Sequence, residues 1–352
     1  MATFDALRNS FQASRSNKKS FGLVLLIMLS VLILVLIFSL FFGSVPVSLS
    51  EFYLGLLDSS LQTQAETIVS VIRFPRVLLA AIVGALLAVS GAVTQGLFRN
   101  PLADPSLIGV TAGASAGGSV VIVMSASLSQ YVFSLWLVSV GAFLGGIVSV
   151  WLVYRLATTD RGTSVATMLL VGIAITALAS SVTSGLEFVA DNAMLRRISL
   201  WKMGGLEGAD YPRILIVLFV LTITLIILPK YATALNAMLL GESEAGYLGV
   251  DVERVKKVLI ILVAAAVGSS VAVAGTISFL GLIVPHIMRR LIGADHRYLL
   301  IFSALAGAIL LMIADTLARF IVAPAELPVG LVTALLGAPF FIFLLVKRRH
   351  YD

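Results

Sequence analysis

Long apolar segments without charge, separated by short polar ones, dominate the pattern of this chain. Residues 105–154 contain no Asp, Glu, Lys, Arg or His over 50 positions. A helix of about 20 apolar residues spans the hydrocarbon core of a bilayer, so this segment alone is long enough for two spans. The pattern predicts an all-α polytopic membrane protein, because a transmembrane β-barrel would instead show short alternating segments.

Ten transmembrane helices account for the apolar segments. They are predicted at 21–43, 76–97, 105–127, 131–154, 163–187, 212–229, 258–275, 279–292, 298–319 and 328–346. The eighth is short because Gly281 and Pro285 interrupt the sequence there, and irregular backbone at membrane depth must be buried in protein or line a cavity. We therefore expect a single transmembrane domain, residues 21–346, between an N-terminal tail (1–20) and a C-terminal tail (347–352).

Charge predicts the orientation of these helices. With the N-terminus inside, the predicted inner loops and tails hold 17 of the 24 Lys and Arg residues. This excess predicts that both termini are cytoplasmic and that the number of spans is even. Although the net charge is +6, the basic residues lie in short loops between spans, so the sequence does not indicate nucleic-acid binding.

Sequence signals for catalysis and metal binding are missing. The chain has no cysteine and no P-loop, H-E-x-x-H or G-x-S-x-G motif, and its three histidines are scattered. Asp315, the one acid in the interior of a predicted span, precedes Arg319 by four residues, which favours an ion pair over a proton relay. Ion-coupled secondary transporters usually bury several charged groups. We therefore expect a non-enzymatic transport protein without a permanently bound cofactor, driven by energy from elsewhere.

One inner loop, residues 231–257, is long enough to have its own structure. A short amphipathic helix predicted at 233–248 places Leu235, Met238 and Leu239 on one face. Gly249 then permits a sharp turn. We expect this loop to bind a partner; a helix lying on the bilayer surface is the alternative.

A series of small residues follows a polar turn, residues 99–105, in which Asn100 and Asp104 are expected to cap the next helix. Gly109, Gly113 and Gly117 are spaced four apart and leave one helix face without side chains. This spacing predicts close helix packing within the subunit. A pore wall or a dimer contact is the alternative.

Two segments of the chain resemble each other. The residues ending at Gly91 are similar to those ending at Gly275, and a proline follows ten positions later in each case, at Pro101 and Pro285. The predicted topology places the two copies at opposite sides of the membrane. The similarity therefore favours an inverted repeat of helices 2–5 and 7–10.

Arg73, Arg76 and Arg319 lie in predicted outer segments, against the positive-inside trend. Positive groups there can attract and orient an acidic partner. A contact with lipid headgroups or a local ion pair is the alternative.

An ordered set of short motifs, covering residues 70–345, resembles the permease subunits of type II ABC importers, which take up iron-siderophores, haem and cobalamin. The set comprises Arg73, Phe74, Pro75, Arg76, Gly91, Ala92, Val93, Thr94, Gln95, Arg99, Asn100, Pro101, Leu102, Ala103, Gly109, Gly113, Trp201, Met203, Gly204, Gly205, Gly241, Glu242, Leu248, Gly249, Gly275, Phe279, Gly281, Leu282, Pro285, His286, Asp315, Arg319, Glu326, Leu327, Pro328, Gly330, Gly337, Pro339 and Phe341.

The resemblance implies ten helices per subunit and a homodimer with a central path along helices five and ten and parts of three and eight. It implies two ATP-binding cassette subunits, which use the ATP, and a periplasmic binding protein, in a bacterial inner membrane. It implies that Arg73, Arg76 and Arg319 receive acidic residues of the binding protein. The polar turn looks most similar to haem permeases, so haem is the expected substrate, with a ferric siderophore or cobalamin as alternatives.

The resemblance also assigns the partner of the long inner loop. It implies that this loop presses on the ATPase. The residues expected to do so are Leu235, Met238, Leu239, Gly241, Glu242, Leu248 and Gly249.

Overall fold

Ten helices make up most of the described chain. The computed structural model describes residues 2–45, 47–48, 50, 64–125, 131–160 and 162–348. Within these ranges, seven helices contain a segment long and apolar enough to cross a membrane. They are α1 (Ala2–Phe41), α4 (Phe74–Leu97), α6 (Tyr131–Ala157), α7 (Val165–Val189), α9 (Tyr211–Met238), α11 (Val252–Ala274) and α13 (His296–Phe320). Two shorter apolar helices, α5 (Val110–Met124) and α14 (Val329–Arg348), and the amphipathic α12 (Leu280–Ile292) complete the predicted ten.

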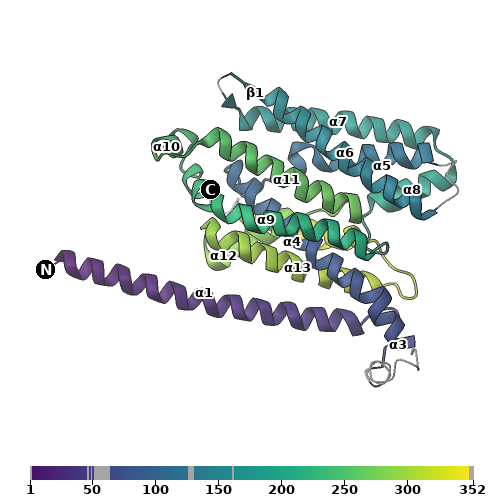
Figure 1. The fold of residues 1–352 in the computed structure, drawn as a ribbon, viewed down its shortest axis with the longest axis horizontal. Helices are drawn as coiled ribbons and strands as arrows, with labels where there is room; N and C mark the ends of the chain where they lie inside the picture. The colour runs from purple at the N-terminus through teal and green to yellow at the C-terminus, as the bar shows by residue number, and fades with distance from the viewer. Residues whose placement is uncertain are drawn as a thin grey trace.

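Short elements connect these helices. They are α3 (Gln64–Thr67), the π-helix η1 (Ile68–Arg73), the 3-10 helix η2 (Pro105–Ile108), α8 (Asn192–Lys202) and α10 (Glu242–Tyr247). The described residues also contain one antiparallel ribbon between α6 and α7, formed by β1 (Thr158–Thr159) and β2 (Gly162–Thr163). The ribbon and α10 lie near each other at one end of the bundle (Figure 1).

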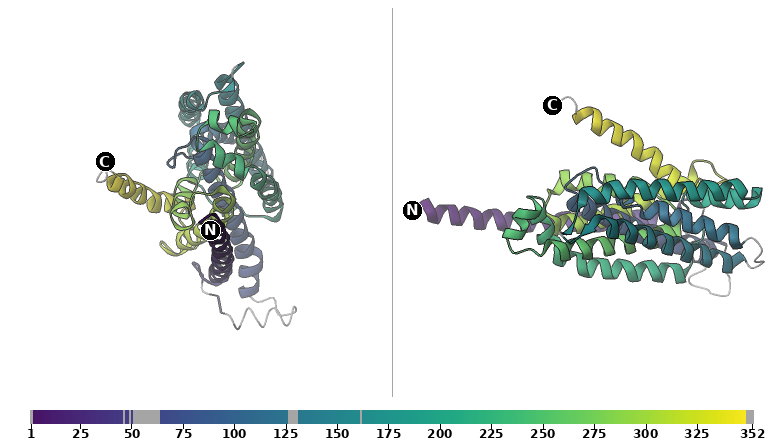
Figure 2. Two further views of the ribbon diagram at one scale, coloured as in Figure 1. Left: turned by 90° about the vertical axis from the view of Figure 1, so that its left-hand side faces the viewer. Right: turned by 90° about the horizontal axis from the view of Figure 1, so that it is seen from above.

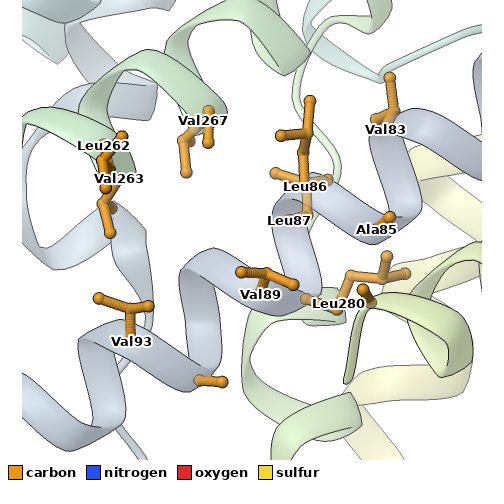
Figure 3. Packing of buried hydrophobic residues seen from close by; sticks show 14 of the residues in the cluster. Val83, Ala85, Leu86, Leu87, Val89, Val93, Leu262, Val263, Val267 and Leu280 are labelled. Carbon is orange, nitrogen blue, oxygen red and sulfur yellow. The ribbon is translucent and has the colours of Figure 1, made fainter. Parts of the chain in front are cut away.

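α4 is the central helix of the bundle. α4 forms the second part of the candidate membrane span Gln64–Leu97, and 89 % of the residues in the apolar segment of that span are buried. α4 packs against α9, α11, α12 and α13. Figure 3 shows Val89 and Val93 of α4 near Leu280 of α12 and Val263 of α11. In contrast, α14 diverges from the bundle (Figure 2).

Glycines bring α5 and α6 into backbone contact. A Cβ atom on Gly117 would lie 2.1 Å from the carbonyl oxygen of Gly141, and one on Gly113 would lie 2.5 Å from that of Gly145. The close packing predicted from the small-residue series is therefore confirmed at Gly113 and Gly117. Gly109 is different, because it adopts a left-handed conformation (φ 77°) before α5 begins.

The polar turn between α4 and α5 is closed by two side chains. Asp104 Oδ1 accepts a hydrogen bond from the Ser106 amide at 2.8 Å and so caps η2, as predicted. Asn100 Oδ1 accepts from the Leu102 amide at 2.9 Å, which closes the turn rather than capping a helix. Arg99 takes up a positive φ of 49° at the start of the turn.

The long inner loop differs most from its prediction. α9 continues through Pro229 to Met238, so residues 233–238 extend a transmembrane helix and only Glu242–Tyr247 forms a separate one. A proline removes one helical hydrogen bond. The helix nevertheless continues, because Leu235 and Met238 are buried in the core beyond it.

Helix lengths and packing support the predicted inverted repeat. The series α4 to α7 has 24, 15, 27 and 25 residues, and the series α11 to α14 has 23, 13, 25 and 20, so the second helix is short in both. α4 packs on α13 while α6 packs on α11, the exchange that a pseudo-twofold axis produces. The similar segments themselves differ locally, because Gly91 is helical within α4 whereas Gly275 ends α11 at φ 65°.

Gly91, Gly281 and Pro105 lie close together, although they are distant in the sequence. A Cβ atom on Gly91 would lie 1.8 Å from the carbonyl oxygen of Gly281, at the start of α12. One on Gly281 would lie 3.0 Å from Pro105 Cδ. The Gln95 amide donates to the Leu282 carbonyl oxygen at 3.1 Å. These contacts fix α4, the polar turn and α12 to one another.

Candidate functional site

A groove lined by hydroxyl groups lies between α5 and α7 and has a volume of about 450 Å³. Residues of η2, α8 and the segment before α12 complete its wall. The polar residues of the lining are Ser106, Thr111, Ser115, Thr176, Ser180, Thr183, Ser184, Lys202, Thr276 and Ser278. Sequence analysis did not identify them, because serine and threonine in apolar helices are common in helix packing as well.

Close backbone contacts fix the shape of this groove. A Cβ atom on Gly172 of α7 would lie 2.0 Å from the Leu107 carbonyl oxygen of η2. The Thr276 hydroxyl donates to the Lys202 carbonyl oxygen, which attaches the segment before α12 to the end of α8. The Lys202 ammonium pairs with Glu187 of α7 at 3.0 Å.

The hydroxyl groups indicate what the groove faces. Those of Thr176, Ser180 and Ser184 have no hydrogen-bond partner among the described residues. Hydroxyls without a partner are costly against lipid, whereas a water-filled cavity satisfies them. The groove therefore fits the wall of an aqueous path better than the lipid-facing surface of the bundle.

α7 and α14 expose apolar side chains beside this region. Leu170 and Leu178 of α7 are 69 % and 63 % exposed, and Leu335 of α14 is 64 % exposed. Only 17 % of the residues in the apolar window of α7 are buried. Either lipid or another helix can cover such faces.

A second site surrounds α10, where the sequence predicted a surface that presses on a partner. Leu239, Leu240, Tyr247 and Leu248 are exposed there, and Tyr247 is the most exposed of them at 91 %. Leu240 and Tyr247 were not predicted. Gly241 (φ 143°) and Gly249 (φ 84°) adopt conformations that favour glycine on either side of α10.

Two predicted residues of this surface lie elsewhere. Leu235 and Met238 are buried, because they belong to the core-facing side of α9 rather than to a separate amphipathic helix. In this conformation they cannot contact another protein directly.

A buried lysine ties α10 to the rest of the subunit. Lys256 of α11 pairs with Glu242 at 2.8 Å and with Glu253 at 2.6 Å, and it donates to the Thr163 carbonyl oxygen. Glu253 also accepts a hydrogen bond from the Thr163 amide at 2.9 Å. Lys256 is 1 % exposed. The start of α10 is thereby joined to the ribbon that precedes α7, the helix that lines the groove.

A polar cluster holds the end of α9 on α13. The Asn236 amide donates to Asp295 at 2.7 Å, and its oxygen accepts from the His296 backbone amide at 2.9 Å. Hydrogen bonds from Arg297 lower the pKa of Asp295 to about 2, so this carboxylate is charged at physiological pH. The sequence pattern does not reveal this cluster, because its members lie about 60 positions apart.

The three outer arginines form a buried network at the opposite end of the subunit. Asp315 accepts from Arg76 Nε at 2.8 Å and lies 3.1 Å from Arg319 Nε, so the ion pair predicted within α13 is confirmed. Arg76 also pairs with Glu326 at 2.6 Å. Arg73 instead donates to backbone carbonyl oxygens at the end of α1.

The outer arginines do not form the exposed positive surface that docking requires. Arg73, Arg76 and Arg319 are 4 %, 6 % and 3 % exposed. Residues at and after the end of α1 cover two of them, and Arg319 donates to the Ser39 carbonyl oxygen there. The local ion pair, one of the alternatives from the sequence, is what the structure contains. Docking of a binding protein at these residues stays a prediction.

The matches to known proteins agree with this architecture. The FecCD transport family matches residues 31–347. The chain belongs to this family. Among relatives of this FecCD permease, the hemin transport system permease protein HmuU of Yersinia pestis is 47 % identical over 279 residues, which cover 79 % of this chain and 83 % of the relative.

Further relatives of this FecCD permease bear other substrates in their names. The cobalamin import system permease protein BtuC of Halobacterium salinarum is 42 % identical over 297 residues, 84 % of this chain and 78 % of the relative. A solved metal-chelate type ABC transporter in an inward-facing conformation superposes with a TM-score of 0.81 at 33 % identity, covering 93 % of this chain and 99 % of the other. The predicted resemblance to type II ABC importer permeases is confirmed.

Proposed function

We propose that this FecCD permease forms a homodimer in the bacterial inner membrane and carries a metal chelate between its two copies, with haem, an iron chelate, first among the candidates. The hydroxyl-lined groove between α5 and α7 supports this proposal most directly, because its unpaired hydroxyls suit water or a polar chelate. In the dimer, α7 and α14 of each copy face the partner. The substrate passes without chemical change.

Haem is the preferred substrate because the hemin permease HmuU is 47 % identical to this chain. Cobalamin is the second candidate, since a cobalamin permease is 42 % identical. A ferric siderophore is the third, because its polar groups would find hydrogen-bond partners along the groove wall. Among the described residues that line it, the groove offers one paired lysine and no histidine, so the path is proposed to guide the chelate rather than to ligate its metal.

ATP-binding cassette subunits supply the energy in this proposal. They dock on the apolar surface formed by Leu239, Leu240, Tyr247 and Leu248. Lys256, which contacts both α10 and the ribbon before α7, then transmits the movement of α10 to α7. α7 lines the path. ATP hydrolysis takes place in the partner subunits, and this chain contributes no catalytic group.

A periplasmic binding protein delivers the substrate to the opposite face. The outer network contains three arginines against Asp315 and Glu326, which leaves one positive charge in excess. We propose that this excess attracts an acidic binding protein at long range. Direct contact with the guanidinium groups requires residues after α1 to move.

An ion-coupled secondary transporter is disfavoured by the same network. Asp315 is fully buried but has two arginine neighbours. Both ion pairs tie Asp315 into the packing of α4 against α13, and an ion-coupled transporter would need further charged groups buried at mid-membrane.

Uptake into proteoliposomes tests the proposed substrate. The permease, its ATPase and its binding protein are reconstituted together, and ATP-driven uptake of haem, cobalamin and a ferric siderophore is measured in parallel. We expect haem to accumulate. Uptake of cobalamin alone or of the siderophore alone would identify that chelate as the substrate instead of haem. Uptake of none of the three would contradict the proposed function.

A further inference from the structure

A second groove lies between α6 and α11, away from the hydroxyl-lined path. It has a volume of about 520 Å³. Its walls are apolar along most of its length, where Ile261 and Ala265 of α11 face Trp151 of α6. Trp151 and Ile261 are 55 % and 57 % exposed, so the groove is open on its outer side.

Two cations lie at one end of this groove. Arg155 and Lys257 line it where α6 ends and α11 begins, together with Tyr154. Both cations are exposed, and neither has an ion-pair partner among the described residues. The nearby acid Glu253 is already bound by Lys256 and by the Thr163 amide. The end of the groove therefore carries free positive charge.

The length of the groove corresponds to one leaflet. It extends from Ile147 of α6 to Thr158, the residue after this helix, about 16 Å at about 1.5 Å per residue. The hydrocarbon core of a bilayer is about 30 Å thick, so one end lies near its centre and the other near the headgroups. Trp151 and Tyr154 lie toward the charged end, where aromatic side chains concentrate at membrane interfaces.

We propose that this groove binds an anionic phospholipid from the leaflet on the α10 side of the membrane. An acyl chain lies between α6 and α11, and the phosphate lies between Arg155 and Lys257. Charge complementarity selects this occupant, because a zwitterionic headgroup would bring its own cation close to two others. The inference does not depend on the transported substrate. It places a lipid next to the lysine that anchors α10.

Lipid titration of the full-length permease in detergent tests the site. Dioleoyl phosphatidylglycerol and dioleoyl phosphatidylcholine are added separately, and bound lipid is counted by native mass spectrometry. Each basic residue near an anionic surface contributes roughly fivefold in affinity. The double variant Arg155→Gln/Lys257→Gln should therefore lose about 30-fold in affinity for phosphatidylglycerol, and it should bind the two lipids with equal affinity.

Two further variants make the test specific. Lys230→Gln/Arg290→Gln removes two exposed basic residues that do not line the groove, and it should keep the wild-type preference. Ala265→Phe fills the apolar part of the groove without changing its charge, and it should weaken the binding of both lipids. Equal affinity of the wild-type chain for the two lipids, equal loss in the control variant, or unchanged binding after Ala265→Phe would overturn the proposal.

Discussion

The Lys256 ammonium lies 2.8 Å from the Glu242 carboxylate and 2.6 Å from that of Glu253, and it is almost completely buried. A buried charge is retained only where partners compensate its desolvation. Here the partners belong to α10 and α11, and the Thr163 carbonyl oxygen adds the ribbon before α7. The surface proposed to meet the ATPase is therefore connected to the helix proposed to line the path.

Neutralising Glu242 tests this connection. Glu242→Gln removes one of the charges that hold the start of α10. We therefore expect the affinity of the permease for its ATPase to fall roughly fivefold to tenfold, as for the loss of a charge-assisted hydrogen bond. Glu244→Gln changes the same charge on the same helix, but Glu244 is exposed and has no ion-pair partner among the described residues. Binding of the purified ATPase to both variants in nanodiscs is the measurement. Equal losses would contradict a specific role for the Lys256 link.

The exposed residues of α10 should matter for partner binding rather than for folding. Tyr247→Ala and Leu248→Ala remove side chains that are 91 % and 66 % exposed. We expect each to weaken ATPase binding about tenfold, as at interface hot spots, with an unchanged melting temperature. Leu235→Ala should instead lower the stability by about 2–5 kcal/mol, because Leu235 is fully buried. Thermal unfolding and ATPase binding, measured on the same samples, separate the two effects.

The contact between α5 and α6 leaves no room for a methyl group. Gly117→Ala places a Cβ atom 2.1 Å from the Gly141 carbonyl oxygen, so we expect destabilisation by about 1–3 kcal/mol. Gly22→Ala is the control, because nothing lies within 4 Å of a Cβ atom there. Alanine favours a helix more than glycine does, so this control should be neutral or slightly stabilising. A stable Gly117→Ala protein would show that the two helices do not touch.

Loss of Arg76 from the outer network should lower the stability of the protein. Arg76→Gln leaves Glu326 unpaired and Asp315 with one neighbour, so we expect a loss of about 3–5 kcal/mol. A second change, Asp315→Asn, should restore part of it, because the buried negative charge is then gone. Unfolding curves of both variants provide the comparison. No rescue by Asp315→Asn would indicate that Arg76 acts through packing alone.

Periodicity predicted the helices well because membrane spans are determined by length and polarity. All ten predicted spans correspond to helices, although α9 ends at Met238 rather than at residue 229. The predicted boundary lies where the apolar segment meets Lys230. The buried positions of Leu235 and Met238 decide the matter, and they depend on neighbouring helices that no local pattern reveals.

Pairings between distant segments were the least predictable part of the site. Asp315 and Arg319 are four residues apart, so their pairing followed from helix geometry. Lys256 and Thr163 are 93 positions apart, and Arg76 and Asp315 are 239 apart. The outer arginines also illustrate a limit of charge patterns. A pattern shows that a cation is near a surface, but not that the end of α1 covers Arg73.

In the proposed mechanism, this permease couples ATP hydrolysis in partner subunits to passage of a chelate. The ATPase rate of the complex reconstituted in proteoliposomes, with and without the substrate-loaded binding protein, tests this coupling most directly. We predict that the loaded binding protein stimulates hydrolysis and that ATP-dependent uptake accompanies it, and that both are lost when this permease is omitted. Uptake by the permease alone, driven by an ion gradient without ATPase subunits, would contradict the account.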